Sequence, residues 1–260
     1  MTLKTNVGRV VWHDLMTYDV PKAIHFYAEL FGWTYQVEHS SDFVWKSGEG
    51  DYPLIFANGE AHGGLVEIKK DLPSHWVAYV EVEDVDAVTA NAKTLGATIS
   101  RNPFDVPGVG RSAVIRDPQG AIICPFMPTH NLPPPSGTFL WNELITDDVA
   151  ASVIFYTKLF GWKAKDGNVE QMKGYTVFKS ADDVEPVGGA MHHSFAIGRP
   201  AAWVPYFSTK EIDESFAKAI ALGAKVQIEV TNVPNEGRFA ILKDPTGAEF
   251  AFFDPIIAGE

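Results

Sequence analysis

The chain has 260 residues, of which 46% are hydrophobic, and it carries a formal net charge of −12 at pH 7. This length and composition exclude a disordered chain and are typical of a globular protein with two domains, each large enough to bury a core of its own. Nucleic acids and anionic membranes bind basic surfaces, so the acidic balance excludes both as the main partner.

The first predicted elements are a strand and a helix. Residues 7–17 alternate between apolar and polar types, which is the pattern of a strand. Asp19-Val20-Pro21 predicts the start of a helix, because Asp caps helix N-termini and Pro is tolerated in the first turn. Apolar residues then recur at helical spacing up to Phe31, and Gly32 supplies the left-handed residue that ends the helix.

Short strands are predicted after this helix, separated by turn residues, at 33–38, 42–47, 52–57 and 64–68. The pattern then restarts with a strand at 77–82, a helix capped by Asp84 at 85–95, and a stop at Gly96. Three further strands follow at 97–100, 112–116 and 121–126. The first half of the chain therefore contains two copies of a unit made of one strand, one helix and several strands.

The second half of the chain repeats the first. Trp12-His13-Asp14-Leu15 returns 129 residues later as Trp141-Asn142-Glu143-Leu144, and the turn Asp117-Pro118-Gln119-Gly120 returns after 127 residues as Asp244-Pro245-Thr246-Gly247. A proline-rich stretch at 128–138 cannot continue a helix or a central strand. The repeats predict duplicated domains at 1–127 and 139–260, joined by a linker at 128–138.

In this order, the repeated motifs resemble the vicinal oxygen chelate superfamily, which includes glyoxalase I, bleomycin resistance proteins and extradiol dioxygenases. The motifs that carry the resemblance in both halves are Phe26-Tyr27, Phe31-Gly32, Leu95-Gly96-Ala97 and the Asp-Pro-x-Gly turn, with their counterparts Phe155-Tyr156, Phe160-Gly161, Leu222-Gly223-Ala224 and Asp244-Pro245-Thr246-Gly247. The opening Trp-x-(Asp/Glu)-Leu is similar to a two-domain branch labelled hydroxylase or glyoxalase-like. The resemblance implies an α+β fold of tandem domains, each of paired βαβββ modules that curl into a half-barrel around a cavity.

The resemblance also implies a divalent metal held by four ligand positions in each domain. In this chain those positions fall on Trp12, Glu67, Val77 and Cys124 in the first half, and on Trp141, His192, Val204 and Ala251 in the second. One usable ligand in four cannot hold such an ion, so we expect no cofactor. The alternative is a shifted metal site at Asp14, Glu67 and His75, with Glu143 and His192 or His193 in the second half.

The carboxylates Asp14 and Glu143 are the strongest candidates for function. Strand alternation places each on the same face as the Trp two residues before it, and a buried carboxylate is costly unless it is hydrogen-bonded or protonated. We expect them to recognise a polar or cationic group, or to act as a general base, in pockets lined by the residues Trp12, Tyr79, Trp141 and Tyr206. The structural alternative is a bond to backbone N–H groups or a pair with Arg111 or Arg238.

Two classes of function therefore stay open. The empty ligand positions favour a protein that binds a small organic molecule without metal, and the alternative is a metal-dependent lyase or dioxygenase-type enzyme. His13 and Asn142 should face away from the cavity, at the surface or between the domains. The lone Cys124 excludes an intrachain disulfide, and no apolar run of about 18 residues occurs, so we expect a cytoplasmic protein. We expect it to be a monomer or a homodimer.

Overall fold

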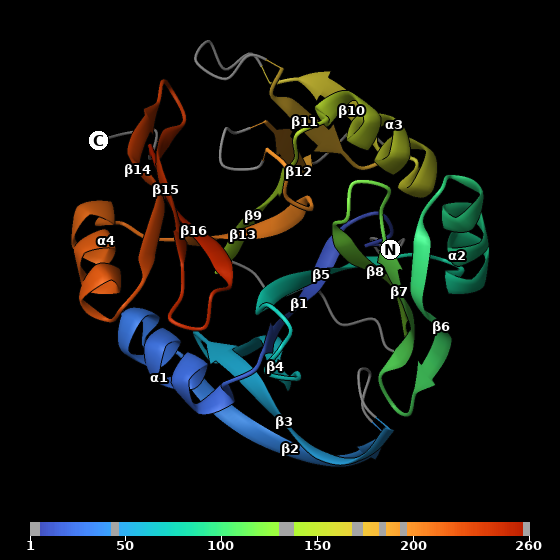
Figure 1. Cartoon of the computed structure of the whole chain (residues 1–260), viewed down its shortest axis with the longest axis horizontal. Coiled ribbons are helices and arrows are strands. Elements are labelled where there is room, and N and C mark those ends of the chain that lie inside the picture. The colour runs from blue at the N-terminus through green and yellow to red at the C-terminus, as the bar shows by residue number, and fades with distance from the viewer. Residues whose placement is uncertain are drawn as a thin grey trace, which may run out of the picture.

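The computed structural model describes residues 6–42, 47–129, 138–167, 174–181, 186–192 and 197–256. Within these ranges each half forms one eight-stranded sheet with two helices (Figure 1). In the first half the elements are β1 (Val10–Thr17), α1 (Val20–Phe31), β2 (Thr34–Asp42), β3 (Ser47–Ala57), β4 (Glu60–Glu67), β5 (His75–Glu81), α2 (Val85–Thr94), β6 (Thr98–Val106), β7 (Gly110–Arg116) and β8 (Ile122–Pro128). In the second half they are β9 (Phe139–Ile145), α3 (Val149–Phe160), β10 (Lys163–Asp166), β11 (Thr176–Lys179), β12 (Pro186–Met191), β13 (Ala202–Ser208), α4 (Ile212–Ala221), β14 (Lys225–Val233), β15 (Gly237–Lys243) and β16 (Glu249–Pro255).

The two sheets have the same topology. The strand orders are β2-β3-β4-β1-β5-β8-β7-β6 and β10-β11-β12-β9-β13-β16-β15-β14. In each sheet the opening strands of the two modules pair antiparallel at the centre, and each opening strand pairs parallel with the last strand of its own module. This confirms the predicted α+β fold of paired βαβββ modules in open, curled sheets.

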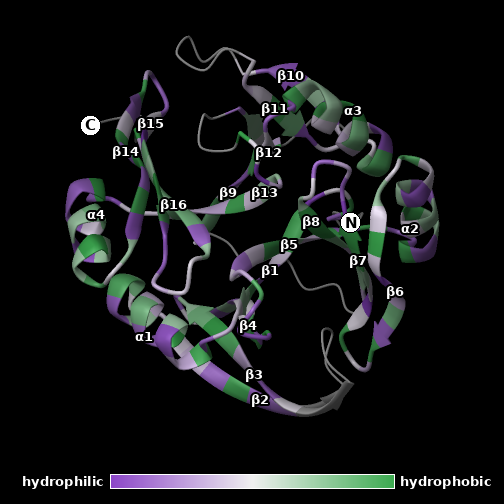
Figure 2. Ribbon diagram, in the orientation of Figure 1, coloured by the Kyte–Doolittle hydropathy of each residue, from purple (hydrophilic) through white to green (hydrophobic). Residues whose placement is uncertain are grey.

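The predicted helix ends are confirmed by their caps. The Asp19 carboxylate accepts a hydrogen bond from the backbone N–H of Lys22 at the start of α1, and Gly32 ends that helix with φ 71°. Asp148 and Gly161 do the same for α3. In Figure 2 the helices carry both green and purple segments, as expected for surface helices with one apolar face.

Two boundaries differ from the sequence prediction. The residues expected to form separate strands at 33–38, 42–47 and 52–57 form only β2 and β3, which pair along most of their length. Residues 43–46, between them, lie outside the described residues. Pro128, expected to begin the linker, is the last residue of β8 and pairs with Gly110, while residues 130–137 of the linker also lie outside the description.

The large hydrophobic cores are shared between the two halves. One core joins α1 and its sheet to α4 and the strands β13–β16, and the other joins α2 and its sheet to α3 and to residues of β9, β11, β12 and β13. Figure 1 accordingly shows α1 beside α4 and α2 beside α3. Each helix therefore packs between its own sheet and an element of the other half, so the halves do not bury separate helix-side cores as their lengths would have allowed.

Two reciprocal hydrogen bonds fasten this arrangement. The Tyr27 hydroxyl of α1 donates to Asp244 at 3.0 Å, and the Tyr156 hydroxyl of α3 donates to Asp117 at 2.8 Å. Each tyrosine oxygen also accepts from an indole, Trp76 at 3.1 Å or Trp203 at 2.9 Å. The Phe-Tyr and Asp-Pro-x-Gly motifs of one half thus meet the complementary motifs of the other.

His13 of the first half and Asn142 of the second half meet in the contact between the halves. Their side chains are 2.6 Å apart and buried, and the His13 ring stacks on Phe139 at 4.1 Å between centroids. This confirms the prediction that they face away from the cavity, and it selects the domain interface over the surface. Among the described residues, none of the helices is long and apolar enough to cross a membrane.

Candidate functional site

Asp14 and Glu143 occupy equivalent places on the central strands of the two sheets. Asp14 on β1 lies between Gly64 of β4 and Val77 of β5, and Glu143 on β9 lies between Gly189 of β12 and Val204 of β13. Both residues are buried: 1% of the surface of Asp14 and 2% of the surface of Glu143 is exposed to solvent. The strand faces that carry them belong to separate apolar clusters on the side of each sheet away from the shared cores.

Asp14 has hydrogen-bond donors on both oxygens. Tyr52 donates to Oδ1 at 2.5 Å, Trp12 Nε1 donates to the same oxygen at 3.1 Å, and Tyr79 donates to Oδ2 at 2.6 Å. Burial and the nearby Asp14 carboxylate raise the pKa values of Tyr52 and Tyr79 well above their usual range, so both phenols stay protonated as donors. The first-half carboxylate is therefore enclosed by three side chains of its own domain.

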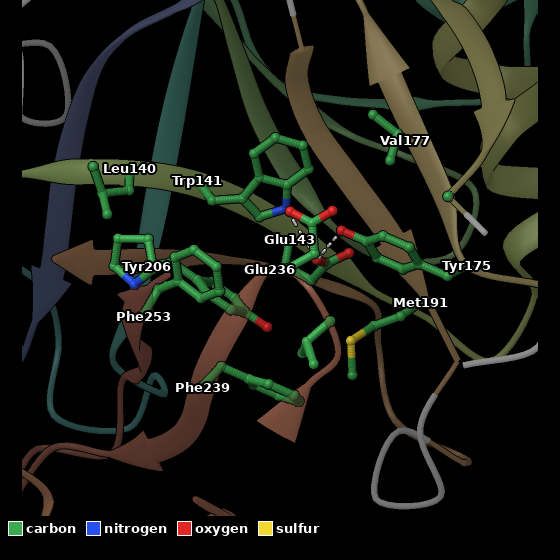
Figure 3. Close-up of a pocket in the computed structure, with 13 residues that line it drawn as sticks. Leu140, Trp141, Glu143, Tyr175, Val177, Met191, Tyr206, Glu236, Phe239 and Phe253 are labelled. Carbon is green, nitrogen blue, oxygen red and sulfur yellow. Dashed lines mark hydrogen bonds between the residues drawn. The ribbon is translucent and has the colours of Figure 1, made fainter. Parts of the chain in front are cut away.

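Glu143 is satisfied on one oxygen only. Trp141 Nε1 donates to Oε2 at 3.0 Å and the Tyr175 hydroxyl donates to the same oxygen at 3.1 Å, as Figure 3 shows. Oε1 is buried and has no hydrogen-bond partner among the described residues. Tyr206, the counterpart of Tyr79, makes no hydrogen bond to Glu143 within the same ranges.

This difference shows in the acidity of Glu143. Burial raises its pKa from 4.5 to about 8, while the hydrogen bonds from Trp141 and Tyr175 act in the opposite direction. A carboxyl in an apolar site with no counterion prefers its neutral form. At neutral pH the Glu143 side chain is therefore mainly a carboxylic acid, which can donate a proton as well as accept one.

Glu143 lies in the wall of a cavity of about 420 Å³ in the second half. The walls are mostly aromatic and aliphatic, and Figure 3 shows these side chains around the Glu143 carboxyl. The lining residues are Leu140, Trp141, Glu143, Gly167, Tyr175, Val177, Met191, Tyr206, Val233, Glu236, Phe239, Phe253 and Pro255. Volumes of this size hold small organic ligands, and a few polar groups among apolar walls fix their orientation.

The predicted metal ligands are not brought together. Glu67 is exposed, and it lies on the same face of β4 as Leu65, which packs in a shared core. Its neighbour Val66 lies on the opposite face and packs with the apolar cluster around Asp14, which we call the cavity-side cluster of the first half. The ligand position that the family resemblance assigned to Glu67 was found by counting four residues past Gly63, and this count selected the wrong face, because a shift of one residue along a strand reverses the side chain. In the second half the cavity-facing residue is Met191, and His192 follows the strand and is exposed.

His75 is on the predicted face, opposite Met16, where its Nδ1 lies 2.9 Å from the carbonyl oxygen of Pro73. Burial lowers its pKa. Across the described ranges no three His, Cys, Asp or Glu side chains form a group that could hold a metal ion, and His193 falls outside those ranges. The donor set of Asp14, Glu67 and His75 thus does not fit the divalent ion that the family resemblance implies.

The two arginines singled out in the sequence pair with other acids, and the cysteine packs in the apolar cluster near Asp14. Arg111 pairs with Asp86 and Asp105, and Arg238 pairs with Asp213, so neither arginine is the partner of Asp14 or Glu143 and that alternative is wrong. Cys124 is fully buried in the cavity-side cluster of the first half, as expected for a packing residue.

Sequence reasoning missed Tyr52, on β3, and Tyr175, which directly precedes β11. Their signal was the repeated pair Gly63-Gly64 and Gly188-Gly189, since a Cβ at Gly64 or Gly189 would clash with the ring or hydroxyl of the neighbouring tyrosine. Two successive glycines in a buried strand indicate close approach by a neighbouring group. Met191 and Phe239 were also missed, because nothing local distinguishes a cavity wall from a core.

The comparisons with known proteins agree with this geometry. The family model of the Glyoxalase/Bleomycin resistance protein/Dioxygenase superfamily matches residues 8–124 and 138–252. "Putative glyoxylase CFP32" of Mycobacterium tuberculosis (strain CDC 1551 / Oshkosh) is 34% identical over 256 residues, which covers 95% of both chains. "Anthracycline biosynthesis protein DnrV" of Streptomyces peucetius is 30% identical over 265 residues, covering 94% of this chain and 92% of that one.

A solved structure has the same fold. A variant of homoprotocatechuate 2,3-dioxygenase from B. fuscum in complex with HPCA superposes with a TM-score of 0.64 at 18% identity, covering 95% of this chain and 71% of that one. At this identity the likeness concerns the fold alone.

Proposed function

The chain belongs to the Glyoxalase/Bleomycin resistance protein/Dioxygenase superfamily, and from that premise we propose that it binds a small, largely apolar organic molecule in its second-half cavity, without the divalent metal of its family. The observation that carries this proposal is the cavity of about 420 Å³ with aromatic walls and one buried carboxyl. The name of DnrV connects that relative with anthracyclines, which are fused-ring aromatic molecules, and flat rings are the ligands that such walls would accept.

The chemistry of the donor set supports metal-independent binding. Near Glu143, Trp141 and Met191 line the cavity, and Val204 and Ala251 pack in the same apolar cluster. None of these supplies an oxygen or imidazole ligand for a hard divalent ion. The same walls instead offer dispersion contacts and ring stacking to an organic molecule.

The test is a titration with prodan, an uncharged naphthyl ketone whose fluorescence shifts to the blue in an apolar site. We expect saturable binding at one site per chain. Val233→Trp, at the cavity wall in β14, should abolish it by filling the space, and Val106→Trp at the corresponding place in β6 should not. Absence of saturable binding, or loss with Val106→Trp alone, would contradict the proposal.

Proton transfer to or from the bound molecule is a second candidate function. A carboxyl with a pKa of about 8 is suited to act as a general acid or base near neutral pH, and Tyr175 and Trp141 hold it in place. The measurement is deuterium exchange of the methyl protons of 2-acetylnaphthalene in D₂O, followed by NMR. Catalysed exchange that disappears in Glu143→Gln would support an enzyme, and exchange at the buffer rate would exclude this chemistry for the ketone.

A further inference from the structure

The described residues that line the second-half cavity include acidic side chains but no basic ones. Glu143 and Glu236 are the ionisable acids among the described lining residues, and none of those residues is Lys, Arg or His. Glu236 is exposed, whereas Glu143 is buried. An ionised Glu143 would therefore sit in an apolar wall without a counterion, which is the least favourable state for a carboxylate.

The hydrogen bonds of Glu143 indicate where its proton lies. Oε2 already accepts from both Trp141 Nε1 and the Tyr175 hydroxyl, so this oxygen is the acceptor of the carboxyl group. Oε1 is the oxygen left without a partner among the described residues. A proton on Oε1 gives the group one acceptor oxygen that is used and one donor that is not, and a buried donor without an acceptor is costly.

We propose that the cavity selects uncharged aromatic molecules that carry a carbonyl oxygen, and that the Glu143 carboxyl donates its hydrogen bond to that oxygen. The inference rests on the proposed binding function and names the ligand class of the same site. The ring system would pack against Phe239 and Tyr206, whose rings stack at 6.2 Å between centroids, and against Met191. The carbonyl oxygen supplies the acceptor that Oε1 lacks among the described residues.

The first half of the chain supports this assignment by contrast. Asp14 accepts hydrogen bonds on both oxygens from Tyr52, Trp12 and Tyr79. Both oxygens of that carboxylate already accept hydrogen bonds, and it has no proton to donate to a carbonyl oxygen. The two equivalent sites therefore differ in the direction of hydrogen bonding: Glu143 can donate to a ligand, whereas Asp14 can only accept. Asp14 provides the matched control.

Burial sets the pH at which the selectivity should disappear. The pKa of Glu143 is raised to about 8, so the donor is present below that pH and is lost as the pH rises through it. A bound carbonyl stabilises the protonated form and moves the loss to higher pH. Above this range the carboxylate repels the carbonyl oxygen and favours a cation instead.

The experiment uses three molecules of nearly the same shape, namely 2-acetylnaphthalene, 2-isopropylnaphthalene and the cation 1-(2-naphthyl)ethylammonium. Their affinities are measured by equilibrium dialysis at pH 6, and those of the ketone and hydrocarbon again at pH 9.5. At pH 6 we expect the ketone to bind about tenfold more tightly than the hydrocarbon, the gain from one buried hydrogen bond, and the cation to bind least. At pH 9.5 the preference for the ketone should vanish.

Variants of Glu143 test whether the preference for the ketone depends on a hydrogen-bond donor at this position. Glu143→Gln keeps an N–H donor and should preserve the preference for the ketone at both pH values, whereas Glu143→Leu should lose the preference and still bind the hydrocarbon. Asp14→Asn should leave all three affinities unchanged. Equal affinities for ketone and hydrocarbon at pH 6, or tightest binding of the cation, would overturn the carbonyl assignment and leave the binding function standing. Failure of all three molecules to bind would overturn both.

Discussion

Replacing Glu143 with Gln should make the protein more stable at alkaline pH, although the substitution changes a buried, hydrogen-bonded carboxyl to an amide. The folded protein holds a proton on Glu143 up to a pKa of about 8, and the unfolded chain releases it near the ordinary value of 4.5. Between these values the unfolded chain binds fewer protons than the folded protein, so stability is lost as the pH rises through the window. The neutral amide of Gln has no such loss.

The size of the effect follows from the two pKa values. At 1.36 kcal/mol per pKa unit, the interval from 4.5 to 8 corresponds to a limit of about 5 kcal/mol. About 4 kcal/mol of this falls between pH 5 and pH 9, since the unfolded carboxyl is already mainly ionised at pH 5. Water entering the cavity would reduce the cost of ionisation, so the figure is an upper limit.

The assay is urea unfolding of the wild type and Glu143→Gln at pH 5 and pH 9, with the difference between the proteins taken at each pH. We expect the stability of the Glu143→Gln variant relative to the wild type to rise by several kcal/mol between the two pH values. Asp14→Asn is the control with the opposite sign, because it removes charge-assisted hydrogen bonds from Tyr52 and Tyr79 and should cost about 1.5 to 3 kcal/mol at pH 7. A difference for Glu143→Gln that is independent of pH would refute the protonated state.

Three other predictions test the frame around the site. The pKa of His13 is lowered to about 4, mainly by burial, so the unfolded chain takes up its proton first and stability should fall by up to about 3 kcal/mol from pH 6.5 to 4; His13→Gln should flatten this acid limb in urea unfolding. Tyr156→Phe deprives buried Asp117 of a donor and Trp203 of an acceptor, so it should cost about 2 to 3 kcal/mol, as should Tyr27→Phe, and unchanged unfolding midpoints would argue against the reciprocal clamps. Protein purified without chelator or nickel column should contain well under one equivalent of divalent metal by mass spectrometry, and a stoichiometric ion would contradict the proposed metal independence.

The parts of the fold that depend on local chemistry could be predicted from the sequence. Asp19 and Gly32 fix both ends of α1 through a cap and a left-handed residue, and neither depends on distant contacts. The repeat extended this reading to the second half, where Asp148 and Gly161 do the same. Alternation along β1 likewise placed Asp14 beside Trp12 and put His13 on the opposite face.

The parts that depend on strand register could not be predicted. Glu67 was assigned to the cavity by counting from Gly63, and an error of one residue in a strand reverses the side chain. Tyr52 and Tyr175 make equivalent contacts but lie 123 residues apart rather than 129, because the stretch from the start of β2 to Tyr52 is longer than the stretch from the start of β10 to Tyr175. Tyr52 and Tyr175 reach the two carboxyls through strand pairing that the local sequence does not encode, whereas Trp12 and Trp141 donate from the same strands as the carboxyls.

The two equivalent carboxyls show what the duplication made possible. Asp14 and Glu143 differ by one methylene, and Tyr79 donates to Asp14 whereas its counterpart Tyr206 does not donate to Glu143 within the described residues. The second carboxyl thereby keeps a raised pKa and an oxygen that has no partner in the part of the chain that the structure describes, an arrangement that can cost a large share of the roughly 5 to 15 kcal/mol by which a domain is stable. The shared cores offset that cost, because α3 packs against the first half and Tyr156 is tied to Asp117 there. The second half can hold an unfavourable group in its cavity because part of its stability comes from the first.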